Sequence, residues 1–315
     1  MSRTRSLLSG IAACLLIAST GAIAASYPER PVTVIVPFNP GGGTDQQARL
    51  IEEAFKTEFG QPLVFVYKPG ANGAIGATEL AKAKPDGYTI AVYTFPLMVM
   101  NALTGAGQYG LEDFDYLGVA SVDEVVLVTR RDGELSSFAA LVEAAKAKPG
   151  KLSIGSVENL GPTHMAALAF KELGVDVNVV PFPGGAQGLT AVLGGHIDAL
   201  FALHGAVRSS ETKLTYLGMA RSDRHAASPN IPTLKENGYD VKSSAARIWI
   251  APKGLPTEIN ERLVEGLRKI YAIDDVKTRH EKVSQIIDFS GGKELKGLID
   301  DFLPNAKMLV EKYGK

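Results

Sequence analysis

The stretch VTVIVPFNPGGGTDQQARLIEEAF, from Val32 to Phe55, passes from an apolar β-branched run through three glycines into a segment of helical periodicity. The run Val32–Val36 is bounded by prolines, which predicts a strand covered on both faces. The triplet Gly41–Gly43 leaves its N–H groups unobstructed, and Thr44 or Asp45 is suited to cap the following helix. Because free N–H groups at a helix start carry partial positive charge, this stretch predicts a site for a carboxylate or phosphate.

The pattern of strand, glycine loop and helix recurs in the next segment. The helix after the glycine triplet is predicted to end at Gly60, and the strand Leu63–Tyr67 follows. This strand leads into KPGANGAIG, whose glycines again precede a helix. After the turn at residues 85–87 comes a further strand, Tyr88–Thr94. Residues 26–124 therefore predict a first α/β unit.

A second α/β unit is predicted to begin near Val125 with the strand VVLVTR. Two of its loops, GSVENLGPTH (Gly155–His164) and PFPGGAQG (Pro181–Gly188), lead into apolar helices. The segment IWIAPKGLP, from Ile248, is interpreted as the chain crossing back to the first unit. The remaining sequence is helical by periodicity, and Pro304 is expected to kink or break the last helix.

Two units joined by two crossings predict a two-domain α/β protein with two mainly parallel sheets. The first domain comprises residues 26–124 and 246–315, and the second comprises residues 125–245. Ligands bind at the ends of strands in open α/β sheets, so the glycine loops of both domains are expected to converge on one cleft. The arrangement predicts a clamshell with its ligand between the domains.

Composition limits the classes of function. A chain of 315 residues with 45% hydrophobic content is long enough for two domains with substantial cores. Its formal net charge is −1, and no basic domain stands out. Nucleic acid is therefore not an expected partner.

The N-terminal segment predicts export. Arg3 and Arg5 precede the apolar run Leu7–Ala18, and small residues follow, which is typical of a cleavable secretory signal over residues 1–25. The run is shorter than the ~20 residues of a spanning helix, which argues against a membrane anchor. A lipoprotein anchor at Cys14 is the alternative. If Cys14 leaves with the signal, the folded protein has no disulfide and no cysteine-ligated metal.

The glycine loops do not match the motifs of nucleotide or catalytic sites. The glycines of KPGANGAIG lack dinucleotide spacing, and neither G-x-x-x-x-G-K-[ST] nor G-x-S-x-G occurs. His164, His196 and His204 have no metal-ligand spacing. Asp45 is better interpreted as a capping or loop-bracing acid than as a base. We therefore expect no enzymatic activity, no metal and no cofactor.

A series of motifs runs in order along nearly the whole mature chain: YPERPVTVIVPFNPGGGTDQQAR, KPGANGAIGA, AKPDGYTI, PGKLSIGS, GPTHMA, VPFPGGAQGLTAVLGGHID, IPTLKENGY and IAPKGLP. Together they resemble the Bug family, the extracytoplasmic solute-binding proteins of tripartite tricarboxylate transporters. The resemblance implies a periplasmic receptor, expected to be monomeric, with the fold of a type II-like periplasmic binding protein. Such a receptor closes on a small organic (di)carboxylate and delivers it to a permease of two membrane subunits.

The resemblance also implies which residues contact the ligand. One carboxylate is expected between two first-domain loops, held by main-chain N–H groups, small hydroxyls and bridging waters. The first jaw comprises Phe38, Gly42, Gly43, Thr44 and Asp45. The second jaw comprises Ala71, Asn72, Gly73 and Ile75. The distal end of the ligand is expected to meet second-domain residues: Ser156, Thr163, His164, Pro183, Gly184, Gly185 and Ala186.

The chain departs from the family pattern where the distal end of the ligand is expected. SAARIWIAP has Ala246 and Arg247 where many relatives carry tryptophan and another aromatic residue. The segment LHGAVR lacks an aspartate that the family often has, and it brings His204 and Arg208. These changes favour a second anionic group on the ligand. The alternatives are that Arg208 is a solvated helix residue and that Arg247 forms a hinge salt bridge.

Two other functions stay open at this point. One is a receptor for another small acid or an amino acid that serves an ATP-driven or sensor partner. The other is an enzyme of the same two-lobed shape, which would need a catalytic base or a cofactor lysine in the cleft. The glycine loops offer neither group.

Overall fold

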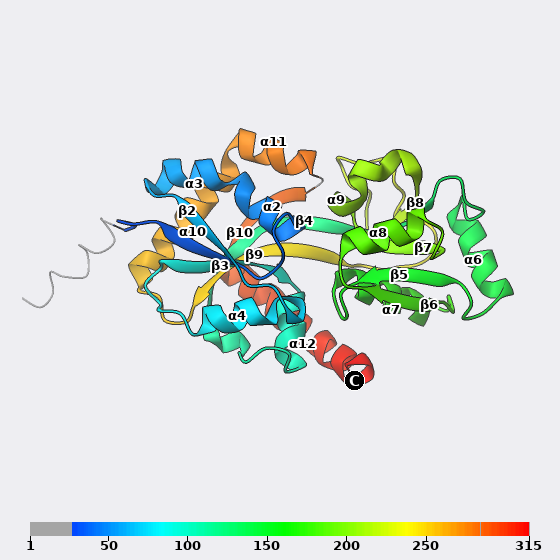
Figure 1. Ribbon diagram of the computed structural model, residues 1–315, viewed down its shortest axis with the longest axis horizontal. Coiled ribbons are helices and arrows are strands. Elements are labelled where there is room, and N and C mark those ends of the chain that lie inside the picture. Colours follow the sequence, from blue (N-terminus) through cyan, green and yellow to red (C-terminus); the bar gives the residue numbers. More distant parts are fainter. Residues whose placement is uncertain (1–26, 284, 315) are drawn as a thin grey trace, which may run out of the picture.

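In the part of the chain that the structure describes, ten strands form one mixed sheet that extends through two domains. Figure 1 shows this computed structural model. The structure describes residues 27–283 and 285–314. The predicted signal peptide and Cys14 lie outside the described residues. Along the sheet the strand order is β2-β1-β3-β9-β4-β7-β5-β6, and β8 and β10 also pair with β4. The predicted two-domain α/β fold is confirmed.

The two domains share one long strand, β4 (Phe114–Arg130). The other strands of the first domain are β1 (Val32–Val36), β2 (Leu63–Tyr67), β3 (Thr89–Phe95), β9 (Ser244–Pro252) and β10 (Gln285–Gly291). The other strands of the second domain are β5 (Ser153–Val157), β6 (Asn178–Phe182), β7 (Ala199–Leu203) and β8 (Leu214–Met219).

Each domain has a parallel core of three strands. In the first domain β1 lies parallel to β2 and β3, and in the second β5 lies parallel to β6 and β7. The pairs that involve β4 or β9 are antiparallel. The sheet as a whole is therefore mixed, because the two strands that link the domains run in opposite directions.

The strand expected to start at Val125 begins eleven residues earlier, at Phe114. Residues 114–124 pair with β9, and Val125–Val128 pair with β7. One continuous strand thus carries the chain from the first domain into the second. The partners change between Glu124 and Val125, although the sequence limits of the domains remain a prediction. Strand β10 was not predicted, since the sequence after Pro256 was interpreted as helical.

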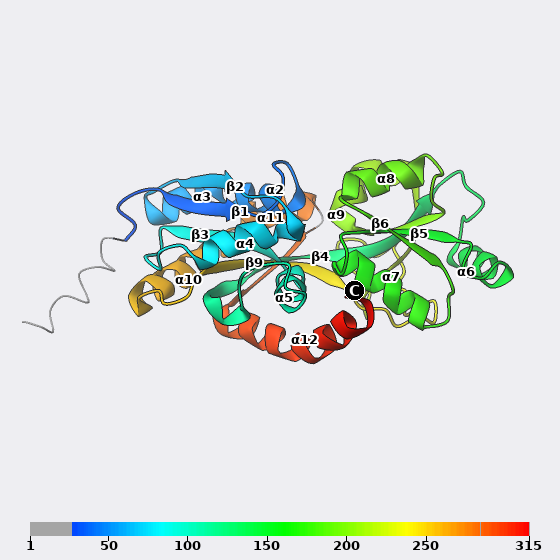
Figure 2. The ribbon, with the colours of Figure 1, turned by 60° about the horizontal axis from the view of Figure 1, so that its bottom comes forward.

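Helices cover both faces of each half of the sheet. In the first domain one face packs on α2 (Gly43–Leu50), α3 (Glu52–Phe59), α10 (Thr257–Ala272) and α11 (Asp274–Lys282). The other face packs on α4 (Ala74–Ala81), α5 (Leu97–Leu103) and α12 (Gly292–Tyr313). Figure 2 shows α5 and α12 below β9. Short 3₁₀ turns lie at η1 (Ala71–Gly73) and η2 (Leu111–Asp113).

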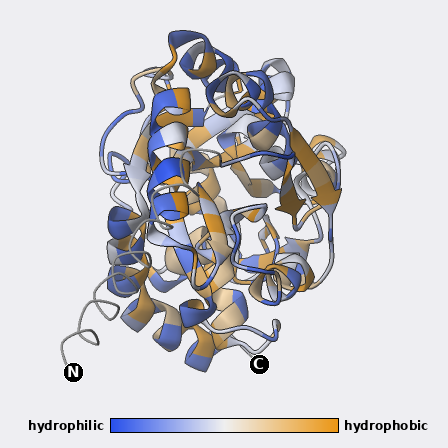
Figure 3. Cartoon of the chain, turned by 90° about the vertical axis from the view of Figure 1, so that its left-hand side faces the viewer, coloured by the Kyte–Doolittle hydropathy of each residue, from blue (hydrophilic) through white to orange (hydrophobic). Residues whose placement is uncertain are grey.

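In the second domain α6 (Phe138–Ala147) and α7 (Pro162–Glu172) cover one face, and α8 (Gly185–Leu193) and α9 (His204–Val207) cover the other. The 3₁₀ segment η3 (Arg208–Lys213) follows α9. Figure 3 shows hydrophilic residues on the outward sides of the helices and hydrophobic residues on the strands between them. None of the helices in the described part of the chain has both the length and the apolar content of a membrane span.

The last helix is not broken at its proline. Helix α12 continues through Pro304 from Gly292 to Tyr313, so of the expected kink or break, the break does not occur. Ile299 and Ala306, on either side of the proline, are both buried in the core. Their burial offsets the hydrogen bond that a proline removes from a helix.

The domains also touch through side chains. At the end of α12, Lys312 Nζ lies 2.8 Å from Glu172 Oε1 of α7. Leu160 and Leu168 of the second domain pack into the apolar cluster between the first-domain sheet, α4, α5 and α12. The structure therefore shows the two domains in direct contact.

A buried group of hydrogen bonds joins α2, the helix that follows the first glycine loop, to β9 and α10. The hydroxyl of Tyr271 on α10 accepts hydrogen bonds from Trp249 Nε1 of β9, at 2.9 Å, and from Gln47 Nε2 of α2. Replacing Tyr271 with phenylalanine leaves two buried donors unsatisfied. We expect the free energy of unfolding to fall by about 2 kcal/mol, measured by urea denaturation.

Tyr313→Phe is the matched control for this substitution. The Tyr313 hydroxyl bonds to Glu172 at the surface, so its loss is expected to cost less than about 0.5 kcal/mol. Equal losses in the two variants would contradict a structural role for the buried group.

Candidate functional site

The first jaw lies between β1 and α2. Gly42 is the N-cap of α2, and the first helical hydrogen bond runs from Gln46 N to Gly42 O. The amides of Gly43, Thr44 and Asp45 precede the first helical donor, Gln46 N, and therefore have no partner within the helix. These N–H groups and the helix dipole make the start of α2 electropositive.

Asp45 braces this loop. Its carboxylate accepts hydrogen bonds from the Gly41 N–H at 2.7 Å, from Arg49 Nε at 3.0 Å and from the Tyr67 hydroxyl at 2.9 Å. The side chain is buried and fully occupied by these contacts. Asp45 thus fixes the shape of the first jaw, as the loop-bracing interpretation predicted, and it offers a ligand only its main-chain N–H.

Arg247 lies beside the first jaw. Its Nη1 donates to Thr94 Oγ1 at 2.7 Å, and Thr94 Oγ1 lies 3.3 Å from Thr44 Oγ1. A methyl group added to Gly43 would come within 3.0 Å of Arg247 Nη2. The guanidinium, two hydroxyls and the start of α2 therefore meet at one place. The structure thus places Arg247 beside the first jaw, and its expected contact with the distal end of the ligand stays a prediction.

The position of Arg247 follows from strand pairing. Arg247 on β9 pairs with Thr94 on β3 and, on its other side, with Ser121 on β4. It is only 4% exposed. Among the side chains that the structure describes, no carboxylate forms an ion pair with it, and its Nε has no hydrogen-bond partner. A hinge salt bridge, the alternative interpretation, is therefore absent from the described part of the chain.

The electrostatics of Arg247 favour an incoming anion. Burial lowers the pKa of its guanidinium, while the charges of Asp123 and Glu158 raise it. A buried cation without a direct anionic partner carries an uncompensated desolvation cost. A carboxylate that meets Arg247 and the α2 amides would supply the missing partner.

The second jaw has an unusual backbone. Ala71, Asn72 and Gly73 have φ values of 47°, 52° and 89°, which is rare for the first two residue types. Asn72 O accepts hydrogen bonds from Asn101 Nδ2 at 2.8 Å and from the Tyr93 hydroxyl at 3.3 Å. These bonds hold a strained turn in place, and such strain is concentrated at functional sites.

The two jaws are packed against each other. The ring of Phe38 lies 5.8 Å from that of Tyr93, centre to centre. A methyl group on Gly73 would come within 2.7 Å of the Tyr93 hydroxyl and 3.1 Å of the Phe38 ring. Ile75, in contrast, is 51% exposed at the start of α4. The structure therefore brings Phe38 of the first jaw against Gly73 of the second jaw.

In the second domain, two predicted site residues serve their own loop. The hydroxyl of Thr163 donates to Val157 O at 2.9 Å and accepts from Val157 N at 2.7 Å. His164 Nδ1 accepts from Leu160 N at 2.9 Å, and burial lowers the pKa of this imidazole. Ser156 differs, because its hydroxyl is buried without a described partner.

The remaining second-domain candidates lie at the starts of α8 and α9. Pro183 and Gly184 precede α8, whereas Gly185 and Ala186 begin it. The His204 ring lies 5.6 Å from that of Tyr216, and its Nδ1 is buried without a described partner. None of the hydrogen bonds described in residues 27–283 and 285–314 joins these second-domain groups to the first jaw.

His204 does not bring a positive charge to the site. Burial, and then the charges of His225 and Arg208, lower the pKa of His204 to about 4. The imidazole is therefore neutral near pH 7. Arg247 lies beside the first jaw, and His204 is neutral. These two of the three groups that favoured a second anionic group on the ligand therefore no longer support such a group.

Several residues around the site were not predicted. Tyr93 and Thr94 are ordinary strand residues by sequence, and Asp123 lies in the interior of β4. Burial raises the pKa of Asp123 to about 6, and its Oδ1 accepts from the Gly205 N–H at 3.1 Å. Glu158 lies in the loop after β5, within a segment that the sequence had already singled out.

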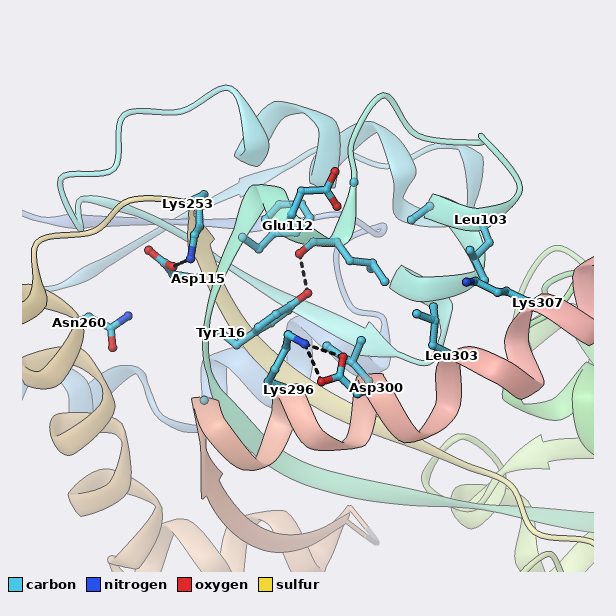
Figure 4. Close-up of a pocket in the computed structure, with 16 residues that line it drawn as sticks. Leu103, Glu112, Asp115, Tyr116, Lys253, Asn260, Lys296, Asp300, Leu303 and Lys307 are labelled. Atoms are coloured by element: carbon cyan, nitrogen blue, oxygen red, sulfur yellow. Dashed lines mark hydrogen bonds and ion pairs between the residues drawn. The ribbon is translucent and has the colours of Figure 1, made fainter.

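Two cavities lie away from the jaws. One, of about 710 Å³, is bordered by Tyr116, Leu103 and residues of α12 (Figure 4). The other, of about 660 Å³, lies in the second domain beside Arg130 and Lys148. Two lysines of the first cavity form ion pairs with its acids: Lys253 with Asp115, and Lys296 with Asp300. The jaws, with their unpaired cation, remain the stronger candidate for an anion site.

Comparison with known proteins identifies relatives of this chain. The family described as "Tripartite tricarboxylate transporter family receptor" matches residues 47–314. BugT of Bordetella pertussis is 33% identical over 77% of this chain and 78% of its own length.

Two solved structures are similar to this chain in sequence and in fold. A TctC solute-binding protein from Polaromonas is 30% identical, with a TM-score of 0.74 over 91% of this chain and 99% of its own. MatC from Rhodopseudomonas palustris, solved with bound malate, is 25% identical, with a TM-score of 0.78 over 90% of this chain and 100% of its own.

Proposed function

Because the chain belongs to the receptor family of tripartite tricarboxylate transporters, we propose that it captures a small organic carboxylate between its two domains and delivers it to the transporter's membrane permease. One observation carries the proposal: the buried Arg247 guanidinium has no ion-pair partner among the described side chains and lies against the start of α2.

The ligand's first carboxylate lies between the two jaws in this proposal. It accepts hydrogen bonds from Arg247, from the amides at the start of α2 and from Thr44. Each charge-assisted hydrogen bond contributes about 1.5–3 kcal/mol before desolvation and immobilisation are subtracted. The second jaw, at Ala71–Gly73, closes the other side of the carboxylate.

The second domain contacts the rest of the ligand. Ser156 and His204 support this role, since each presents a buried polar atom without a described partner. Residues at the starts of α7 and α8, among them Thr163 and Ala186, surround this part of the ligand. The bound malate in MatC supports a ligand of similar size and chemistry.

The remaining parts of the proposal concern location and partners. The receptor acts in the periplasm as a monomer, after removal of the predicted signal over residues 1–25. It has no enzymatic activity and requires no cofactor. Residues 27–283 and 285–314 contain no cluster of three or more potential metal-ligating side chains.

A thermal-shift screen with malate, succinate, adipate, butyrate and inorganic phosphate tests the proposal. At a hundredfold excess of ligand over Kd, binding adds about 2.7 kcal/mol to the free energy of unfolding. We expect at least one carboxylate to raise the melting temperature by several degrees, which is about the shift that such a gain gives in a chain of this size. A shift with phosphate and with none of the carboxylates would refute the proposal.

A further inference from the structure

Gly205, the second residue of α9, lies at a close contact between the two domains. A Cβ atom added to it would lie 2.6 Å from Val283 O, which directly follows α11. Ordinary contacts between a carbon and a carbonyl oxygen are about 3.3–3.6 Å long. Helix α9 packs in the second domain and α11 in the first, and Figure 1 shows α9 on the side of its domain nearest the end of α11. Only a residue without a side chain lets the domains approach this closely here.

The contact lies on the same face of the sheet as the first jaw. Helix α11 packs against α2, whose first residues belong to that jaw. Arg247 and Trp249 share one face of β9, because side chains alternate along a strand. Trp249 is buried with residues of α2 and α11, so Arg247 lies on their side of the sheet. Arg247, the start of α2 and the contact between α9 and α11 are therefore on one side of the strands that link the domains.

The first domain fixes the position of Val283. The Val283 N–H donates to His280 O at 3.0 Å. His280 is fully buried, its ring lies 5.7 Å from that of Tyr271, and its Nδ1 lies 2.8 Å from Val276 O. The carbonyl that faces Gly205 is thus held by the end of α11 and cannot move away without disturbing a buried side chain.

Strand β4 provides the point about which α9 moves relative to α11. The Gly205 N–H donates to Asp123 Oδ1 at 3.1 Å. Asp123 is in the part of β4 that pairs with β9, and the strand exchanges β9 for β7 between Glu124 and Val125. Because α9 and α11 already touch at Gly205, the second domain cannot rotate further toward α11 about this point. The opposite rotation separates the two helices.

Resting on the proposed function, we propose that the contact of Gly205 with Val283 limits how far the two domains close on the ligand. In the unliganded receptor the second domain is mostly rotated away, and the contact is absent. In the liganded receptor the missing side chain lets α9 reach α11, on the side where the first jaw lies. Apparent affinity scales with the population of the state that binds, so Gly205 raises the affinity for every carboxylate without contacting it.

Gly205 is not required by the fold of its own domain. Its φ lies outside the range that favours glycine, so the backbone of α9 accepts alanine. The three atoms nearest the added Cβ belong to Val283 and Asp123. Asp123 Oδ2, at 3.2 Å, is the end of a side chain and can shift slightly, whereas Val283 O belongs to the main chain. A methyl group at this position is therefore tolerated in the open receptor and disfavoured in the closed one.

Gly205→Ala tests the proposal by calorimetric titration with malate, succinate, adipate and butyrate. Overpacking of this kind corresponds to a loss of about 5- to 150-fold in affinity. We expect the same factor for each carboxylate that the wild type binds, since the methyl group acts on closure and not on the ligand. The melting temperature of the unliganded receptor is expected to stay the same or rise, because alanine favours a helix more than glycine does.

Fluorescence energy transfer between the domains measures closure directly. Labels are attached through Lys56→Cys on α3 and Glu143→Cys on α6, two exposed positions in different domains. A saturating carboxylate is expected to change the transfer efficiency in the receptor that has glycine at position 205. At the same degree of saturation, Gly205→Ala is expected to show a smaller change, because its domains stop short of full closure.

Gly297→Ala is the matched control. Gly297 lies in α12, and no atom comes within 4 Å of a methyl group added to it. This variant has the same change from glycine to alanine within a helix. It is expected to bind carboxylates and to close as the wild type does.

Three outcomes overturn the inference. If Gly205→Ala binds the carboxylates as tightly as the wild type does, the contact does not limit closure, and the proposed function stands. If affinity is lost while the change in transfer efficiency at saturation stays that of the wild type, Gly205 does not act through closure, and the proposed function again stands. If none of the four carboxylates binds the wild type, the carboxylate assignment falls and this inference falls with it.

Discussion

Replacing Arg247 with methionine is expected to weaken carboxylate binding about 30- to 150-fold. The substitution removes the cation that faces the start of α2 but keeps much of the side-chain volume. Truncating one partner of a buried, hydrogen-bonded charge pair costs about 2–3 kcal/mol at the low end of measured values, which corresponds to that loss of affinity. Calorimetric titration with the best carboxylate of the screen measures the effect.

The same substitution has a distinct effect on stability. In the absence of ligand Arg247 is a buried cation without an ion-pair partner in the described part of the chain. An apolar replacement is therefore expected to change stability little, because the desolvation cost that it removes offsets the lost attraction to Asp123. A loss of binding with an unchanged or higher melting temperature therefore separates a ligand-binding role from a structural one. If the variant keeps its affinity for carboxylates, Arg247 is not part of the site.

Arg247→Lys is the matched control for charge. It keeps the positive charge but loses the planar fork of the guanidinium, so an intermediate affinity is expected. Because Arg247 lies in the first jaw, monocarboxylates and dicarboxylates are expected to lose affinity by the same factor in either variant. A loss confined to dicarboxylates would instead place Arg247 at the distal end of the ligand.

Gly73→Ala is expected to disrupt the second jaw. The new methyl group would come within 2.7 Å of the Tyr93 hydroxyl, and the φ of 89° is unfavourable for any residue with a Cβ. Strain and overpacking together are expected to lower the free energy of unfolding by about 3 kcal/mol. Displacement of one or two ligand-binding amides is expected to reduce carboxylate affinity by at least about tenfold.

Gly174→Ala is the matched control for backbone strain. Gly174 has a φ of 92°, and no atom lies within 4 Å of an added methyl group. This variant is expected to lose about 1 kcal/mol of stability and to bind carboxylates as the wild type does. If the two alanine variants lose the same stability and bind alike, the packing of Gly73 against Tyr93 and Phe38 has no role in the site.

Local patterns in the sequence predicted much of the fold. Strands Val32–Val36 and Leu63–Tyr67 have the predicted limits, because short β-branched runs between prolines and glycines carry a clear signal. The first half of β4 gave no such signal, since Gly118, Ser121 and Asp123 interrupt its apolar residues. Those positions are buried because β9 and β10 flank the strand, and pairing between distant segments is not visible in a local pattern.

The site was predictable only in part. Glycine loops before helices indicated the first-domain jaws, and the departure at Arg247 pointed to an unusual residue. Its place beside the first jaw was not visible in the sequence, because it depends on the register between β9 and β3, where Arg247 pairs with Thr94.

A crystal structure of the receptor with the carboxylate that gives the largest thermal shift tests the central claim most directly. We expect one carboxylate to lie between the jaws, with an oxygen about 2.7–2.9 Å from a nitrogen of Arg247 and others near the amides of Gly43 and Thr44. A carboxylate bound elsewhere, for example in the cavity beside Tyr116, with Arg247 uncontacted, would contradict the account.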